Sequence, residues 1–282
     1  MNQVFDQYVH EVFSGNGNDH FTFENGAGTV STGRGADTVI SKGWINSLDT
    51  GAGDDLVFFE GGAGADSVDL GNGKNTMFFG TGWIGSLTGG NKTDFISGTG
   101  NVGMADLGGG NDQLLVTGRV NTIDAGSGHD LVEVGGTGFA SLGAGNDIFI
   151  GNGWVNHVDG GSGADTITLN AGGNAFGGKG NDVFVTGAKA THFDGGAGKD
   201  TFEFDFTNEN LAEHDRFDGG AGKDTLHVVI DPKDVSAHQI DALKAELEAR
   251  GGDFDGHIAA LNMTLANVEE VKLTIDGEDF VF

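Results

Sequence analysis

Acidic residues recur along this chain at nearly constant intervals, and each stands in the same local setting. Glycine lies four positions before each aligned residue, glycine also lies two positions before all but one, and an apolar residue follows two positions later. This pattern, G-x-G-x-D-x-U with U apolar, is centred on Asp19, Asp37, Asp55, Asp66, Asn75, Asp94, Asp112, Asp130, Asp147, Asp165, Asp182, Asp200 and Asp224. Asn75 replaces the acid in one copy, and Lys92 replaces a glycine in another.

The spacing of these acids indicates cation binding. Without Asp66, successive acids lie 17 to 20 residues apart, except for a last step of 24 residues. If each step is one coil of a stacked structure, the carboxylates form a single file about 5 Å apart, where they repel one another unless cations lie between them. Carboxylate and turn carbonyl oxygens are hard ligands that favour Ca²⁺, whereas Mg²⁺ demands a stricter octahedral geometry.

We therefore predict about eight or nine Ca²⁺ ions in one row. The predicted carboxylate ligands are Asp19, Asp37, Asp55, Asp94, Asp112, Asp130, Asp147, Asp165, Asp182, Asp200 and Asp224. The predicted turn glycines are Gly15, Gly17, Gly33, Gly35, Gly51, Gly53, Gly108, Gly110, Gly126, Gly128, Gly143, Gly145, Gly161, Gly163, Gly178, Gly180, Gly196 and Gly198. Sites near residues 72–94 should be the weakest, and Asp66, the one copy on the opposite turn, lacks a stacked partner.

Positioning such a row requires short strands and tight turns. The segment after each motif acid reads as a strand with one inward face, and a second apolar segment such as GWINSL or GWVNHV completes the unit. Two short strands and two turns make one coil, and stacked coils bury the apolar faces that no single coil could bury. The sequence predicts an all-β parallel solenoid of about 12 coils of ~18 residues.

Three segments, DGGAGKDTF, SGNGNDHFTF and GGKGNDVFV, resemble the nonapeptide repeat of RTX (repeats-in-toxin) proteins. The resemblance implies a right-handed parallel β-roll, Ca²⁺ held between stacked turns by the motif Asp and turn carbonyls, and folding driven by Ca²⁺. Family rolls usually carry the motif on both turns of a coil, whereas this sequence carries it on one. The resemblance also implies type I secretion, for which the terminal GEDFVF is a candidate signal and a final cap strand is the alternative.

Outside the repeats, the pattern changes. We assign 1–13 to an N-terminal cap segment, 14–230 to the calcium-binding roll, and 231–282 to a C-terminal α+β cap with the candidate secretion signal. Within the cap, 234–250 reads as a helix with Ile240, Leu243 and Leu247 on its apolar stripe and Gly251 as its C-terminal cap. The segment NVEEVKLTI-DG-EDFVF reads as a hairpin.

Composition narrows the function. The formal charge of −28 argues against nucleic acid or an anionic membrane as partner. The sequence contains no apolar run long enough to span a membrane. It has 54 glycines and no cysteine, which excludes disulfide bonds and thiolate metal ligands. The chain lacks H-E-x-x-H and G-x-S-x-G, so we predict no enzyme. We expect a secreted structural protein of a bacterial surface layer or matrix. The alternatives are an ice-binding solenoid and a secreted host-directed effector.

Two further sets of residues carry open alternatives. Trp44, Trp83 and Trp154 occupy equivalent places, where they either pack against the next coil or form a stripe for a surface glycan or a second chain. A second file of acids precedes the motif acids by six positions and is either solvated or raises local Ca²⁺ affinity: Asp49, Asp69, Asp106, Asp124, Asp159, Asp194 and Asp218. Self-association is the other partner expectation.

Overall fold

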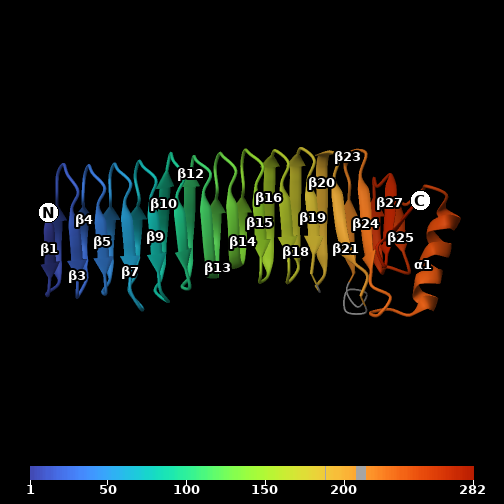
Figure 1. Cartoon of the computed structure of the whole chain (residues 1–282), viewed down its shortest axis with the longest axis horizontal. Coiled ribbons are helices and arrows are strands. Elements are labelled where there is room, and N and C mark those ends of the chain that lie inside the picture. Colours follow the sequence, from blue (N-terminus) through green and yellow to red (C-terminus); the bar gives the residue numbers. More distant parts are fainter. Residues whose placement is uncertain (188, 208–213) are drawn as a thin grey trace. The chain divides into compact units, whose positions relative to one another are not determined.

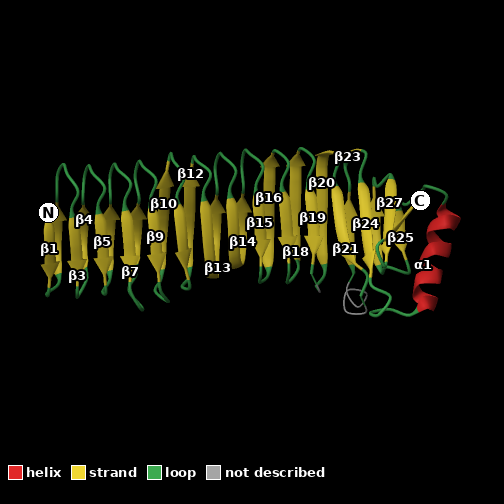
Figure 2. Cartoon of the chain, viewed as in Figure 1, coloured by secondary structure: helices red, strands yellow, loops and turns green. Residues whose placement is uncertain are grey.

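The computed structural model describes residues 1–187, 189–207 and 214–282. The chain is a β-solenoid of about 11 turns with a spacing of ~18 residues, close to the 12 coils that the motif count predicted. It contains two compact units, Met1–Gly143 and Ala144–Phe282, which are described separately below. The all-β prediction is confirmed: strands dominate the described residues, and the helix lies in the C-terminal cap (Figure 2).

The N-terminal unit consists of two parallel ladders in which each strand pairs with its equivalent one coil away. The first ladder contains β1 (Asn2–Phe5), β3 (His20–Phe23), β5 (Thr38–Ser41), β7 (Leu56–Phe59), β9 (Thr76–Phe79), β11 (Phe95–Gly98) and the first parts of β13 (Gln113–Asp124) and β14 (Leu131–Ser141). The second contains β2 (Val9–Phe13), β4 (Ala27–Ser31), β6 (Ile45–Asp49), β8 (Ala65–Asp69), β10 (Ile84–Gly90), β12 (Val102–Gly108) and the later parts of β13 and β14.

The C-terminal unit repeats this arrangement (Figure 1). Its first ladder contains β15 (Ile148–Gly151), β17 (Thr166–Leu169), β19 (Val183–Thr186), β21 (Thr201–Asp205), β24 (Thr225–Ile230) and β27 (Glu270–Ile275). Its second contains β16 (Val155–Ser162), β18 (Gly173–Lys179), β20 (Thr191–Gly198), β22 (Asp215–Asp218) with the short β23 (Ala221–Gly222), and β26 (Met263–Ala266). β25 (Gly256–Ile258) and β28 (Glu278–Val281) pair antiparallel with β26 and β27.

The core of each unit is built from the apolar residue two positions after each motif acid. These residues are at most 2% exposed in every coil of the main row, from Phe21 to Leu226. In the C-terminal unit two of them, Phe184 and Phe202, stack with their ring centroids 5.2 Å apart, and Phe217 of β22 stacks on Phe202 at the same distance. Burying each such side chain contributes roughly 1.5–3 kcal/mol, so stability accumulates only as coils stack.

The predicted cap helix and hairpin are confirmed, with one shifted boundary. α1 spans Ala237–Arg250 rather than 234–250, because Ser236 and Gln239 form a reciprocal capping box that starts the helix at Ala237. Gly251 ends the helix in the left-handed conformation at φ 59°. Leu243 and Leu247 are buried, while Ile240 is only partly covered.

The two ends of the chain join the ladders instead of standing apart from them. Residues 1–13 supply β1 and β2, which pair in parallel with β3 and β4 and so complete a first coil. At the other end, β26 and β27 pair in parallel with β22 and β24. The hairpin of β27 and β28 turns at Asp276–Gly277, both at positive φ, and its first strand belongs to a last coil that the repeat pattern did not show.

Candidate metal centre

Each motif acid forms a backbone contact with the coil before it. In the N-terminal unit, Oδ1 of Asp37 accepts the N–H of Asp19 at 2.7 Å, and the same contact recurs from Asp37 to Asp130, at distances of 2.7 to 3.0 Å. In the C-terminal unit it recurs from Asp147 to Asp224 at 2.8 Å. The predicted file of acids is therefore present in each unit, tied to the backbone through one carboxylate oxygen.

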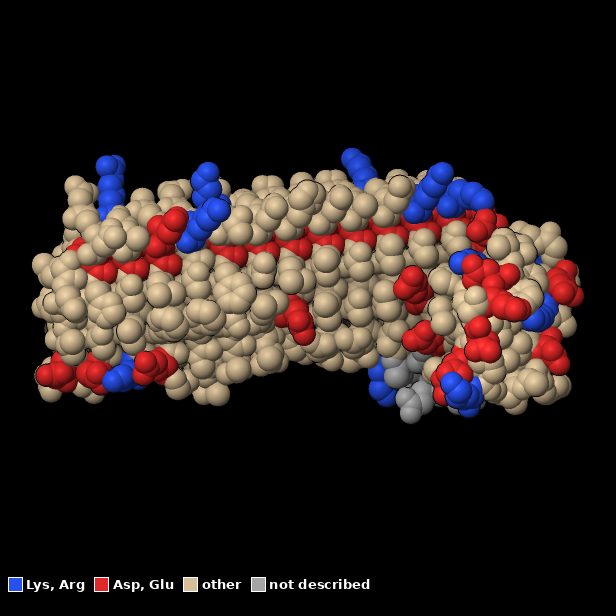
Figure 3. Space-filling view, viewed as in Figure 1, with Lys and Arg blue, Asp and Glu red and all other residues tan. Residues whose placement is uncertain are grey.

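The acids of the main row are buried. Their exposed fraction is 7% at Asp19 and at most 2% at the others. The acidic atoms show as a recessed line in the view of Figure 3. A second oxygen, Oδ2, is buried without a hydrogen-bond partner among the described residues at Asp37, Asp55, Asp94, Asp112, Asp165, Asp182, Asp200 and Asp224. An ionised oxygen in that condition costs free energy unless a cation or a proton satisfies it.

Burial raises the pKa values of several carboxyl groups in the row. Desolvation is the largest cause, and it raises the pKa of Asp94 and Asp165 to about 7 and that of Asp55, Asp112 and Asp200 to about 6. The hydrogen bond from the preceding coil opposes the shift, and neighbouring carboxylates add to it in most of these groups. Without metal, these five carboxyl groups therefore keep their protons to a higher pH than a free aspartic acid does.

The turn glycines place the backbone of one coil directly on that of the next. Gly161 and Gly163 have φ of 91° and 135°, which side chains rarely adopt. The carbonyl of the first motif glycine accepts a hydrogen bond from the next turn, as Gly15 does from Arg34 at 2.8 Å and Gly33 from Ala52 at 2.8 Å. These carbonyls, expected as ligands, thus already accept one hydrogen bond, and each oxygen retains a second lone pair.

The residue five positions before each motif acid decides what lies beside Oδ2. Where it is glycine, no side chain separates Oδ2 from the carbonyl oxygen of the equivalent residue one coil on. A Cβ added at Gly160 would lie 2.6 Å from Oδ2 of Asp165 and 2.7 Å from the carbonyl oxygen of Gly177. The same arrangement, in which the two oxygens lie close together beside a residue without a side chain, is called the glycine cradle here and occurs at Gly89, Gly160, Gly177, Gly195 and Gly219.

Other coils fill that place with a side chain. Thr32 and Thr50 put a buried hydroxyl there, and each donates to the carbonyl oxygen one coil on, at 2.9 and 2.8 Å. Fully buried apolar side chains precede the remaining motif residues at this position: Leu70, Leu107, Ala125 and Leu142. Coils that share the same motif thus differ in whether a glycine or a larger residue lies beside Oδ2.

Asn75 and Asp66 depart from the row in different ways. Oδ1 of Asn75 accepts the N–H of Asp55 at 3.0 Å, so the backbone contact survives. Its other terminal atom is the donor Nδ2, 3.3 Å from the carbonyl oxygen of Gly73, and a donor cannot ligate a cation. Asp66 is exposed on β8 and does not join the buried row.

The second file of acids lies on the outward face of the second ladder. Asp49 pairs in register with Asp69, and Asp106 with Asp124. Asp49 and Asp69 are exposed, as are Asp106 and Asp124 in the N-terminal unit, and Asp159, Asp194 and Asp218 in the C-terminal unit are partly exposed. This arrangement agrees with the solvated alternative.

The three tryptophans pack on the next coil and are also partly exposed. A Cβ added at Gly64, Gly103 or Gly172 would come within about 3 Å of the ring of Trp44, Trp83 or Trp154, respectively. Their exposed fractions are 38%, 42% and 51%. Each indole is thus partly covered where it packs against a glycine of the next coil, and the rest of the ring is accessible to solvent.

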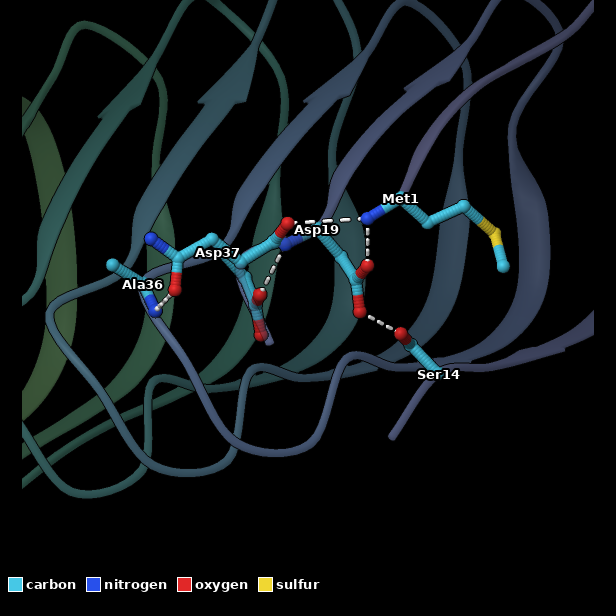
Figure 4. A network of polar contacts seen from close by, with 6 residues as sticks. Met1, Ser14, Asp19, Ala36 and Asp37 are labelled. Atoms are coloured by element: carbon cyan, nitrogen blue, oxygen red, sulfur yellow. Dashed lines mark hydrogen bonds and ion pairs between the residues drawn. The ribbon is translucent and has the colours of Figure 1, made fainter. Parts of the chain in front are cut away.

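Sequence reasoning missed the residues that terminate the row. At the N-terminal end, the carboxylate of Asp19 contacts the amino group of Met1 and the hydroxyl of Ser14 (Figure 4). At the C-terminal end, Oε2 of Glu269 accepts the N–H of Asp224 at 2.7 Å, the contact that an Asp makes elsewhere. Glu269 precedes the apolar Val271 by two positions, and this fragment of the motif could have identified it.

A further omission concerns the residue before each motif acid. Asn18, Asn146 and Asn181 accept, through Oδ1, the N–H of the equivalent residue one coil on, at 2.8 to 3.0 Å. The Asn-Asp dipeptide of several motif copies therefore forms a second ladder of side-chain contacts beside the row.

The residues at the glycine cradles fit Ca²⁺. Each cradle presents one buried carboxylate oxygen and one backbone carbonyl oxygen, which are the ligand types that Ca²⁺ takes. Among the described residues, no cluster of three or more His, Cys, Asp or Glu side chains is in place to hold a metal ion. None of the described helices is long and apolar enough to cross a membrane.

Comparison with known proteins agrees with this donor set. The family model for the RTX calcium-binding nonapeptide repeat matches residues 58–82, 106–137, 141–175, 176–207 and 211–228, together about half of the chain. No curated protein and no solved structure shows a significant match.

Proposed function

Because the chain belongs to the family of RTX calcium-binding repeat proteins, we propose that it is a secreted, non-catalytic structural protein of the bacterial cell surface or matrix whose folding depends on Ca²⁺. One observation carries this proposal: buried carboxylates stack coil upon coil, and eight of them, between Asp37 and Asp224, have an oxygen that lacks a hydrogen-bond partner in the described structure. Cations neutralise such a row, so the free energy of binding becomes free energy of folding.

The bound ions concentrate at the glycine cradles. Gly160, Gly177, Gly195 and Gly219 give the C-terminal unit four of them, whereas Gly89 gives the N-terminal unit one. Coils with Thr, Leu or Ala at that position bind Ca²⁺ more weakly, because a side chain occupies the place beside Oδ2. The row of about eight or nine ions expected from the motif thus divides into strong and weak sites.

A circular dichroism titration tests the calcium dependence. Metal-free protein at pH 7.5 gains β-structure as Ca²⁺ is added, and Mg²⁺ at the same concentration has much less effect. Equal β-structure in chelator and in Ca²⁺ contradicts the proposal.

A structural role requires a surface through which copies of the chain associate. On the first ladder of the N-terminal unit, the outward positions from Thr38 to Leu131 carry no charge, in a chain of formal charge −28. They include Ile40, Leu56 and Phe58, whose ring stacks on the 39%-exposed Phe78 at 5.3 Å. The negative charges of two copies repel each other over most of the surface, so the copies associate through this uncharged, apolar face, where the repulsion is smallest.

Electron microscopy with and without Ca²⁺ tests this role. Filaments or sheets that form with Ca²⁺ and dissolve in chelator support a self-assembling matrix component, whereas monodisperse particles contradict it. Ice binding requires a regular outward array, and the outward file Thr38, Leu56, Thr76 and Phe95 is irregular. We therefore expect no thermal hysteresis in a solution of the calcium-bound protein, and measurable hysteresis would favour ice binding over the structural role.

A further inference from the structure

The C-terminal cap continues the row of motif acids with residues that no repeat contains. β22 pairs with β26 so that Asp218 lies opposite Ala266, and β24 pairs with β27 so that Thr225 lies opposite Glu270. By this register, Asn267 takes the place equivalent to Gly219, and Glu269 takes the place equivalent to Asp224. The connection between these two places is three residues shorter than in a repeat, so the cap keeps the row without the glycine turn.

The oxygen atoms at this junction match those of the repeat cradles. Asp224 is fully buried, and its Oδ2 has no hydrogen-bond partner among the described residues. A Cβ added at Gly219 would lie 2.6 Å from that Oδ2 and would collide with the carbonyl oxygen of Asn267. The two oxygens therefore lie close together beside Gly219, and no side chain of that residue separates them.

The cap holds these groups in position through several contacts. The Asn267 backbone N–H donates to Asp255 at 2.7 Å, and its side-chain amide donates to Asp218 at 2.7 Å. Glu269 uses Oε2 for the Asp224 N–H, while its own N–H donates to the Asp224 carbonyl at 3.1 Å. Lys223, the nearby cation, pairs with Glu270 at 2.7 Å and not with Glu269.

We propose that Asp224, Asn267 and Glu269 form a terminal Ca²⁺ site that ties the cap to the last repeat. The ligands are Oδ2 of Asp224, the carbonyl oxygen of Asn267 and the Glu269 carboxylate, with water completing the coordination. The site rests on the proposed calcium-dependent function and extends it beyond the repeats. Its role is to let the cap dock only when the row is metal-loaded.

Equilibrium dialysis against Ca²⁺ tests the site in the full chain. Glu269→Gln keeps the side-chain size and an oxygen for the Asp224 N–H but removes the charge, and it should bind one ion fewer than the parent. Glu270→Gln, which alters the adjacent, partly exposed carboxylate paired with Lys223, is the matched control and should bind the parental number. Hydrogen exchange at saturating Ca²⁺ should show lost protection at Asp224 and 263–275 in Glu269→Gln alone.

A second variant approaches the same place from the opposite side. Gly219→Ala adds a methyl group to the cradle and should also remove one ion, whereas Gly62→Ala, which meets nothing within 4 Å, should remove none. Parental ion numbers in either folded variant, or the loss of several ions in both, would overturn the terminal site. A parent protein that binds no Ca²⁺ would instead refute the proposed function itself.

Discussion

At the scale of single residues, the two oxygens of each motif carboxylate have different roles. Oδ1 accepts a backbone N–H from the preceding coil, so it holds the coils in register even when the residue is Asn75. Oδ2 is the buried atom without a partner at positions such as Asp182. We therefore propose that coil register and cation binding depend on separate atoms of one side chain.

This division predicts the effect of Asp182→Asn. The amide keeps Oδ1 for the N–H of Asp165 but replaces Oδ2 with a donor, so the coil should remain folded and bind one Ca²⁺ fewer in equilibrium dialysis. Asp194→Asn, a partly exposed acid of the outer file, removes the same charge and serves as the control. Equal ion numbers in the two variants would contradict the assignment of Oδ2.

The raised pKa values predict opposite effects of pH on the metal-free and calcium-bound forms. Folding raises the pKa of Asp94 and Asp165 from 3.8 to about 7, so the metal-free fold takes up protons. Its stability is therefore greatest at acidic pH and is lost as pH rises through about 4 to 7. Ca²⁺ requires the ionised carboxylates, so its affinity should rise over the same range.

Circular dichroism in chelator checks the first part: β-structure should be greater at pH 5 than at pH 8. Calorimetry at pH 6 in buffers of different ionisation enthalpy checks the second, since Ca²⁺ binding should release protons. A metal-free protein that is no more folded at pH 5, or binding without proton release, would show that the row is not protonated.

At the scale of elements, the coil is the unit that folds, and its tightest restriction is the turn. Glycine at the turn permits positive φ and the direct stacking of one backbone on the next, as at Gly161 and Gly163. The strands add only short in-register ladders, which bury one apolar face each. The C-terminal cap ends this series with a helix whose start is set by a capping box.

The capping box predicts that Ser236→Ala weakens the cap. Loss of the hydroxyl removes the side-chain acceptor of the Gln239 backbone N–H, at a cost of about 1 kcal/mol. Hydrogen exchange of α1 in Ca²⁺ should detect faster opening of the helix, while protection in β15 to β21 stays unchanged. His238→Ala, an exposed change in the same first turn, should not weaken the helix; equal effects would exclude the cap as the cause.

At the scale of the whole molecule, charge and apolar surface determine behaviour together. The formal charge of −28 disfavours a compact state until cations neutralise the row, and it keeps copies apart. The outward positions from Thr38 to Leu131 on the first ladder of the N-terminal unit are the exception to this repulsion, and the exposed Glu133 borders them. Calcium-dependent folding should therefore precede association.

Phe78→Glu should separate these two steps. A carboxylate on the apolar face should abolish calcium-dependent association in sedimentation velocity while leaving the circular dichroism titration with Ca²⁺ unchanged. Thr122→Glu adds the same charge to an exposed position on the other ladder and should associate like the parent. If both variants associate equally, contact between copies lies elsewhere.

The sequence by itself determined the coil length, the solenoid class, the row of acids and the cap elements. These follow from local regularities: glycine where turns need positive φ, alternation where strands need one buried face, and caps on either side of a helix. Stacking in register then required only that every coil has nearly the same length.

Only the tertiary structure decided the environment of each carboxylate. The place beside Oδ2 is lined by a residue five positions earlier and by a carbonyl one coil later, so it depends on contacts between coils. The motif showed Asp112 and Asp165 as equivalent, although Leu107 precedes one and Gly160 the other. Glu269 joined the row because the chain returns after the helix to pair with β24, a long-range contact that no local pattern contains.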